Sequence, residues 1–209
     1  MKSALEKNKE YANRFIQEVS GSKVPKEIKK ILINKKIRSF IDLGCGDGGL
    51  IHALYNEFPK VKVSGVDISP RRIRGLSEKF PNYRFYCEDV CNTELKENSF
   101  DFVHSSQVIE HVEDDGKMIS EMFRLLKNNG FLFVSSVIKR PFAVYKYRNK
   151  GKFVLDPTHE REYRNIREFL SLFKNFKLIN YRVYPVKRDL ASFEIKIPGY
   201  YIIEALWKK

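Results

Sequence analysis

The sequence has no long apolar run. None of its hydrophobic stretches approaches the roughly 20 residues that a bilayer crossing needs, and the polar amino-terminal stretch lacks the apolar core of a secretory signal. Cysteine is scarce as well: Cys45, Cys87 and Cys91 form no CxxC pair, and no histidine lies near the last two in sequence. Buried thiols are therefore expected, rather than a disulfide or a zinc site. These absences predict an intracellular protein, which we place in the cytoplasm.

Repeats and low-complexity linkers are also missing. A chain of 209 residues can bury a core of its own, so we expect a single domain over residues 1–209. A net charge of +13 favours phosphate-rich or acidic partners, which leaves nucleic acid open as a partner. The sequence has no arginine-rich tail and no RNP1-like pattern, so the charge by itself does not establish RNA binding.

Strands and helices alternate over the first two thirds of the chain. Apolar runs that end in turn residues predict strands at 39–43, 60–66, 83–87, 100–105 and 131–137, and helices between them, the last at 114–126 and closed by 128–130. This alternation predicts a parallel sheet with right-handed crossovers. Strands at 176–184 and 193–206 share only a short connection and predict an antiparallel hairpin. The expected fold is α/β: a Rossmann-like, doubly wound, mostly parallel seven-stranded sheet with this C-terminal hairpin, in an α/β/α sandwich.

Two segments lie outside this alternation. Residues 1–35 are expected to form N-terminal helices, at 5–19 and from Pro25 to about Asn34. Residues 138–163 are predicted to be a lid-like insertion, followed by a helix at 166–173. The insertion is basic and aromatic, so it could stack on and bind an anionic acceptor, or pack as an amphipathic helix with solvated lysines. A basic amphipathic stretch could also touch an anionic membrane surface.

A glycine-rich loop follows the first predicted strand. Gly44, Gly46 and Gly49 match the dinucleotide pattern GxGxxG, and Asp67 ends the second strand at a spacing that suits a ribose contact. Asp42 stands where dinucleotide sites carry an apolar residue, and Asp47 in the turn would repel a pyrophosphate but tolerate a cationic sulfonium. The sequence also leaves no second domain for a hydride acceptor. The loop therefore favours a methyl donor over NAD.

The sequence resembles the class I S-adenosylmethionine-dependent methyltransferases with the signature D-L-G-C-G-x-G. Four segments are similar to their motifs in order: 41–48, 65–69, 87–90 and 100–112. The resemblance implies a loop backbone that wraps the methionine part of the cofactor, an acid on the ribose hydroxyls and a second acid at the adenine amino group. The implied cofactor-binding residues are Asp42, Gly44, Cys45, Gly46, Gly48, Asp67, Ile68, Asp89, Val90 and Ser105.

Two histidines with neighbouring carboxylates are candidates for the chemistry. Glu110 and His111 follow the fourth strand, and His159 lies in the polar segment 156–163. Histidine can act as a base near neutral pH, and a histidine–carboxylate cluster can also hold a divalent cation. In ubiquinone-pathway O-methyltransferases and small-RNA 2′-O-methyltransferases an E-x-x-E-H segment at this place binds a metal, but here Gln107 replaces the first glutamate. We therefore predict that Glu110, His111 and His159 are catalytic, with a metal held by the same three residues as the less favoured alternative.

The expected activity is O-methylation of a hydroxyl on a small molecule, a lipid-linked precursor or a glycan, with S-adenosylmethionine as cofactor. A positioned acceptor and a base to take the hydroxyl proton are what such a transfer needs. Two alternatives stay open: an RNA methyltransferase of the 2′-O type, and a non-catalytic cofactor-binding protein. The sequence has no N-P-P-Y-type tetrad after the fourth strand, which disfavours methylation of base amino groups.

Overall fold

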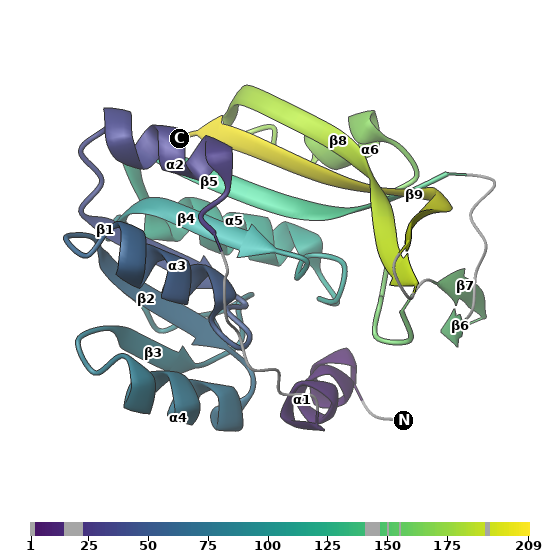
Figure 1. The fold of residues 1–209 in the computed structure, drawn as a ribbon, viewed down its shortest axis with the longest axis horizontal. Coiled ribbons are helices and arrows are strands. Elements are labelled where there is room, and N and C mark those ends of the chain that lie inside the picture. Colours follow the sequence, from purple (N-terminus) through teal and green to yellow (C-terminus); the bar gives the residue numbers. More distant parts are fainter. Residues whose placement is uncertain (1–2, 15–22, 141–146, 150, 155, 191–192) are drawn as a thin grey trace.

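The computed structural model describes the chain apart from residues 1–2, 15–22, 141–146, 150, 155 and 191–192 (Figure 1). Its main sheet has the strand order β3-β2-β1-β4-β5-β9-β8. The strands are β1 (Ser39–Leu43), β2 (Lys62–Asp67), β3 (Arg84–Cys87), β4 (Phe100–Ser106), β5 (Leu126–Lys139), β8 (Lys177–Leu190) and β9 (Phe193–Lys208). The pairs among β1 to β5 are parallel, whereas β9 pairs antiparallel with both β5 and β8. The predicted parallel sheet and its C-terminal hairpin are confirmed.

Helices cover both faces of the sheet (Figure 1). They are α1 (Ala4–Arg14), α2 (Lys26–Asn34), α3 (Gly49–Glu57), α4 (Pro70–Lys79), α5 (Asp115–Leu125) and α6 (Ile166–Ser171). Successive residues of a strand point to opposite faces, so Phe102 and Val103 of β4 belong to different apolar clusters. One cluster packs α2, α3 and α4 on the sheet, and the other packs α5 and α6 on the opposite face. The three layers confirm the α/β/α sandwich.

The junction between α5 and β5 differs from the prediction. Residues 128–130 do not close the helix: α5 ends at Leu125, and β5 already begins at Leu126, which pairs with Phe100. The turn-forming residues accommodate an irregularity within the strand, where Asn129 has φ +64°. The backbone of Lys209, at the other end of the chain, pairs with Asn129 and Gly130. The helix therefore ends within one residue of the predicted position, and the long-range pairing extends β5 back into the predicted turn.

The insertion at 138–163 contains a second, two-stranded sheet. Strands β6 (Tyr147–Asn149) and β7 (Lys152–Val154) pair antiparallel, and Tyr163 then forms a parallel bridge with Ile138. Within the described part of this insertion the structure has no helix, so the amphipathic-helix interpretation is wrong there. The N-terminal helix is described from Ala4 to Arg14, and its predicted continuation to residue 19 lies outside the described residues. None of the described helices combines the length and apolar composition that a membrane crossing requires.

Candidate functional site

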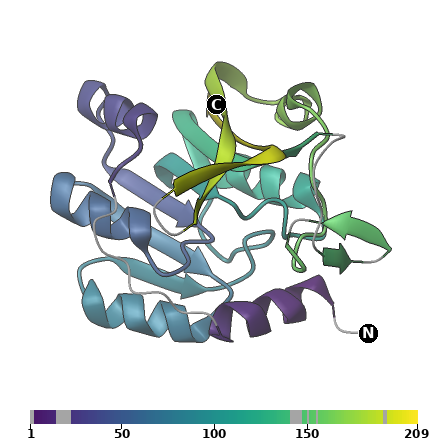
Figure 2. The ribbon, with the colours of Figure 1, turned by 45° about the vertical axis from the view of Figure 1, so that its right-hand side comes forward.

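A cavity of about 560 Å³ opens at the carboxyl ends of the parallel strands. It lies where the strand order reverses between β1 and β4, the place where open α/β sheets bind ligands, and its volume suits a cofactor-sized molecule. Helix α1 lies beyond these strand ends and supplies part of the wall, and the β6–β7 hairpin lies close to the amino end of α1 (Figure 2). The α1 residues in the wall are Leu5, Asn8, Tyr11 and Ala12.

The glycine loop between β1 and α3 is held against β2. The backbone N–H groups of Gly44 and Cys45 both donate to the carbonyl oxygen of Val66, at 2.7 and 2.9 Å. Gly44 has φ +77°, and a Cβ at this position would lie 2.3 Å from Val108. A Cβ on Gly46, by contrast, would meet only the tip of Arg72 at 4.0 Å. The loop is therefore packed tightly on one side and leaves its backbone open to the cavity on the other.

Gly48 gives the first prediction, because it combines a left-handed backbone with a close neighbour. Its φ is +81°, and a Cβ would lie 2.3 Å from Cδ2 of Leu76. We expect Gly48→Ala to lower the free energy of unfolding by about 2 kcal/mol through backbone strain and overpacking. The matched control is Gly75→Ala in α4, where a Cβ meets nothing within 4 Å. This control should be neutral or raise stability by up to about 1 kcal/mol. Urea unfolding of both variants checks the pair, and equal midpoints would contradict the prediction.

Asp67, at the end of β2, binds the backbone of the glycine loop with its carboxylate. Its Oδ2 accepts a hydrogen bond from the N–H of Gly46 at 2.8 Å, and its Oδ1 accepts one from Ser69 at 2.9 Å. Burial raises the pKa of Asp67, against the lowering effect of these hydrogen bonds and of Arg72. The carboxylate lines the cavity, so it lies where a ligand's hydroxyl groups could donate to it.

The wall of the cavity is predominantly acidic. Five carboxylates line it, against two cationic side chains: Asp67, Glu88, Asp89, Glu113 and Asp114, with Arg72 and Lys117. Such a wall favours a ligand that carries positive charge and disfavours a pyrophosphate. Ile68 and Val90 supply apolar wall beside the acids. Of the predicted cofactor-binding residues, those in the wall are thus Gly44, Gly46, Asp67, Ile68, Asp89 and Val90.

The other predicted cofactor-binding residues do not line the cavity. Asp42 is buried, and its Oδ1 lies 2.6 Å from Nδ1 of His104 on β4. Cys45 is buried in the core, and burial raises the pKa of its thiol well above the usual value. Ser105 is fully enclosed and donates its hydroxyl to the carbonyl of Leu43 at 2.8 Å. Gly48 begins α3 as its N-cap. In place of Ser105, the wall contains Ser106 and Gln107.

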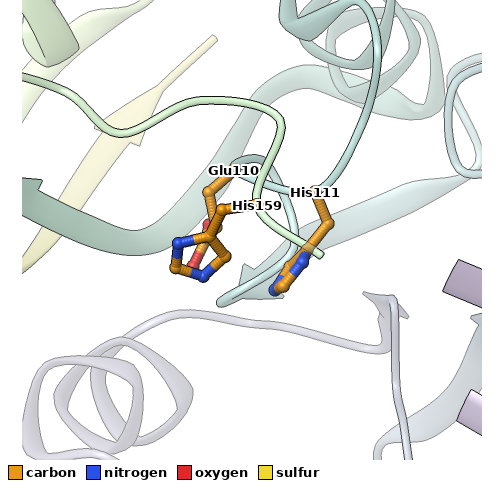
Figure 3. A group of neighbouring side chains, drawn as sticks. All are labelled: Glu110, His111 and His159. Atoms are coloured by element: carbon orange, nitrogen blue, oxygen red, sulfur yellow. The ribbon is translucent and has the colours of Figure 1, made fainter. Parts of the chain in front are cut away.

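Glu110, His111 and His159 come together at one side of the cavity (Figure 3). One potential ligand atom from each lies within 4.8 Å of the others, and the two imidazole rings are edge to face with centroids 4.8 Å apart. The backbone holds the two segments together, since Glu160 and Arg161 both donate N–H bonds to the carbonyl of Glu110. Two imidazoles and a carboxylate could serve as a base system or as metal ligands.

His111 is the member of this group that lines the cavity. Its Nδ1 lies 3.0 Å from the hydroxyl of Thr158, which in turn donates to Asp156 at 2.5 Å. The carbonyl of His111 accepts a hydrogen bond from Asn8 of α1 at 2.8 Å. Burial, together with the nearby charge of His159, lowers the pKa of His111 to about 4. The ring is therefore neutral at physiological pH and able to accept a proton.

Glu110 and His159 lie deeper than His111. Glu110 is fully enclosed; its Oε2 accepts a hydrogen bond from Ser136 at 2.8 Å, while its Oε1 is buried without a hydrogen-bond partner. Burial raises the pKa of Glu110 to about 7. His159 is only 5% exposed, and its Nδ1 lies 2.9 Å from Oε1 of Glu162. The polar segment forms turns and bends, and it places this ring in the interior.

Arg161 holds the loop after His111 in place. Its guanidinium pairs with Asp115 at 2.7 Å and donates to the carbonyl oxygens of Val112 and Glu113. Arg161 thereby links the 156–163 segment to the start of α5.

Comparison with known proteins relates part of the chain to methyltransferases. Residues 41–134 match a family model described as a methyltransferase domain. Similar proteins include a trans-aconitate 2-methyltransferase of Variovorax paradoxus, 30% identical over 94 residues (45% of this chain, 36% of that protein). A malonyl-acyl-carrier-protein O-methyltransferase of Ilyobacter polytropus is 25% identical over 152 residues (70% of this chain, 55% of that protein). A ubiquinone/menaquinone biosynthesis C-methyltransferase of Campylobacter jejuni is 32% identical over 111 residues (51% of this chain, 47% of that protein). The chain thus spans about half, or less, of the length of these relatives.

Solved structures share the fold over the whole chain. The cyclase SpnF superposes with a TM-score of 0.72 at 13% identity, covering 100% of this chain and 97% of its own. A geranyl diphosphate C-methyltransferase of Streptomyces coelicolor gives 0.71 at 12% identity, covering 99% and 98%. At such identities the likeness is one of fold, and the presence of a cyclase shows that this fold carries more than one chemistry.

Proposed function

We propose that this chain, whose residues 41–134 match a methyltransferase domain, is a class I S-adenosylmethionine-dependent methyltransferase that methylates a hydroxyl group of its acceptor. The observation that carries the proposal is a single cavity whose wall contains both Asp67 with the glycine loop and, at another point, the neutral imidazole of His111. The first part suits the methyl donor, and the second suits the removal of a hydroxyl proton.

The residues in the wall fit S-adenosylmethionine. Asp67 would accept the ribose hydroxyls, Ile68 and Val90 would pack on the adenine, and Asp89 would face its amino group. The open backbone at Gly46 leaves room for close approach, and the acidic wall suits a ligand with a sulfonium and an ammonium group. When bound, the cofactor supplies an activated methyl group.

The chain's own residues would position the acceptor and hold its proton. His111 faces the cavity as a neutral base, and its ring is fixed by Thr158 on one side and by His159 on the other. A base within hydrogen-bond reach of the acceptor hydroxyl would make its oxygen a better nucleophile. We include Glu110 and His159 in the catalytic group because they lie next to His111 on the side away from the cavity. The acceptor class remains a small molecule, a lipid-linked precursor or a glycan.

Labelled methyl transfer tests the proposal. The protein is incubated with ¹³C-methyl S-adenosylmethionine and fractionated metabolite, lipid and glycan extracts, and the methyl carbon of each product is observed by NMR. We expect the label on oxygen, in a linkage that resists mild base as an ether does and a methyl ester does not. Label on nitrogen or carbon would refute the O-methylation proposal. Tight cofactor binding with no product in any fraction would favour the non-catalytic alternative.

The RNA alternative rests on the net charge of +13. Neutralising phosphates releases counterions, so specific RNA binding should fall steeply as salt rises. A salt titration with short RNA separates the cases: weak binding at all salt concentrations removes the alternative, whereas a steep dependence together with methyl transfer to RNA would replace our proposal.

Metal removal gives a further prediction. We expect turnover to survive treatment with EDTA, because Gln107 offers only a neutral amide, and its nitrogen already donates to Ser135 at 3.3 Å. The measurement compares methyl transfer before and after chelation and gel filtration, with metal content determined in parallel. A loss of activity that added Mg²⁺ or Zn²⁺ restores would instead make Glu110, His111 and His159 metal ligands.

A further inference from the structure

Glu162 is the enclosed carboxylate behind the candidate base. Its Oε1 lies 2.9 Å from Nδ1 of His159, and the side chains are only 3% and 6% exposed, respectively. A carboxylate can only accept at this contact, so Nδ1 of His159 is the donor and the tautomer of the ring is fixed. Glu162 is not part of the cavity wall. It can therefore influence an acceptor only through another residue.

The segment that carries Glu162 is held in place on both sides. Before it, Glu160 and Arg161 donate to the carbonyl of Glu110; after it, Tyr163 pairs with Ile138 of β5 and donates its hydroxyl to Asp115. This anchoring places the carboxylate against His159 without help from a ligand. Because the ring of His159 in turn contacts the ring of His111 edge to face, its orientation restricts the positions open to the His111 ring.

We propose that Glu162 is a positioning residue of this site: it fixes the ring of His159 through Nδ1, and the fixed ring holds His111 against the cavity. The two imidazoles then form one unit, with His111 in contact with the acceptor and His159 as its support. Glu110 lies on the other side of the two rings, and its Oε1 has no hydrogen-bond partner. Without Glu162, the ring of His159 could rotate toward this oxygen. The role of Glu162 in turnover rests on the proposed function, but its effect on the two rings does not.

Ring NMR tests the effect on structure without an acceptor. The chain has four histidines, so their long-range ¹H–¹⁵N correlations can be assigned with single His→Gln variants. In the protein saturated with S-adenosylhomocysteine we expect His159 as the Nδ1–H tautomer. Glu162→Gln should shift His159 toward a mixture of tautomers and move the His111 signals, with cofactor affinity unchanged. Glu160→Gln, on the same segment, is the matched control and should leave both rings as they are. An unchanged His159 in Glu162→Gln overturns the proposal.

A double-mutant cycle tests the effect on turnover. If Glu162 acts through His159, Glu162→Gln should lower kcat about tenfold to a hundredfold in the wild-type background. It should have no further effect in a His159→Gln background, and Glu162→Asp should restore part of the rate. The proposal is overturned if the losses of kcat from Glu162→Gln and His159→Gln are additive. It is also overturned if the loss of kcat in Glu162→Gln is explained by a matching loss of stability in urea unfolding. If Glu162→Gln changes the NMR signals of both histidine rings but the protein methylates no hydroxyl, the proposed function is refuted and the role of Glu162 is not. If the protein methylates a hydroxyl but the losses of kcat in the double-mutant cycle are additive, the role of Glu162 is refuted and the proposed function is not.

Discussion

Asp67→Asn is expected to weaken the binding of S-adenosylhomocysteine by about a hundredfold. Hydrogen bonds to a charged acceptor contribute roughly 1.5–3 kcal/mol each, and every 1.4 kcal/mol is a factor of about ten in affinity. Asparagine keeps one acceptor oxygen but replaces the other with a donor. Oδ2 of Asp67 also orders the loop through Gly46, so the substitution weakens both the ribose contact and the backbone that frames it.

Isothermal titration calorimetry gives the dissociation constants for this comparison. The fold should survive, because asparagine has the same shape and keeps one of the two acceptor oxygens that bind the N–H groups of Gly46 and Ser69. Urea unfolding verifies this. The control is Glu57→Gln, which removes an exposed carboxylate that pairs with Lys29 far from the cavity. An affinity within threefold of wild type for Asp67→Asn would show that the ribose lies elsewhere.

The parallel part of the fold could be predicted because its signals are local. Strand β1 has the predicted bounds, and Ser69 caps α4 as the Ser-Pro pair indicates, with Arg72 donating to its hydroxyl. The early start of β5 at Leu126 could not be predicted in this way. There the decisive partner is Lys209, about 80 residues further along the chain, and no local pattern reveals it. Local turn chemistry is a sound guide only where no distant strand competes for the same backbone.

In the candidate site, too, local patterns could be predicted and long-range contacts could not. Residues at or just beyond the end of a strand, such as Asp67 and Asp89, could be placed in the cavity because parallel strands bring their carboxyl ends to one edge. Ser105 stays a prediction: its hydroxyl bonds to the carbonyl of Leu43, and because neighbouring strand residues face opposite ways, it is Ser106 that lines the wall. The partnership of Asp42 with His104 needs the β1–β4 register, in which the two residues lie directly opposite each other.

Helix α1 shows what the sequence could not reveal about the site. Its apolar spacing predicts a helix, but not which face of the sheet or which edge it covers. Asn8 and Tyr11 reach the cavity only because α1 lies across the strand ends, tied by Asn8 to the carbonyl of His111 and by Asn13 to Ser69. Such placement depends on tertiary contacts between segments that are distant in sequence.

His111→Ala is expected to lower kcat by about a hundredfold to ten-thousandfold, the usual effect of losing a positioned base. Affinity for S-adenosylhomocysteine should stay within about threefold of wild type, because the ribose and adenine contacts expected for the cofactor come from other parts of the wall. His52→Ala in α3 is the matched control: its ring contacts Asn56 and Phe80, away from the cavity wall, and kcat should be unchanged. A variant at His111 that keeps the full kcat would remove this residue from the mechanism.

The pH profile supplies an independent measurement of the same residue. Burial and the charge of His159 disfavour protonation of His111 and hold its pKa near 4, so the ring remains a free base down to about pH 5. An ordinary histidine, with a pKa near 6.5, would be mostly protonated there. The acid limb of kcat/KM should therefore fall below about pH 5. In His159→Gln one of the two lowering effects is gone, so the limb should move to higher pH. Because burial raises the pKa of Glu110 to about 7, the profile is also measured in Glu110→Gln. A limb near pH 6.5 that persists in Glu110→Gln, or one that His159→Gln leaves in place, would mean that the titrating base is not His111.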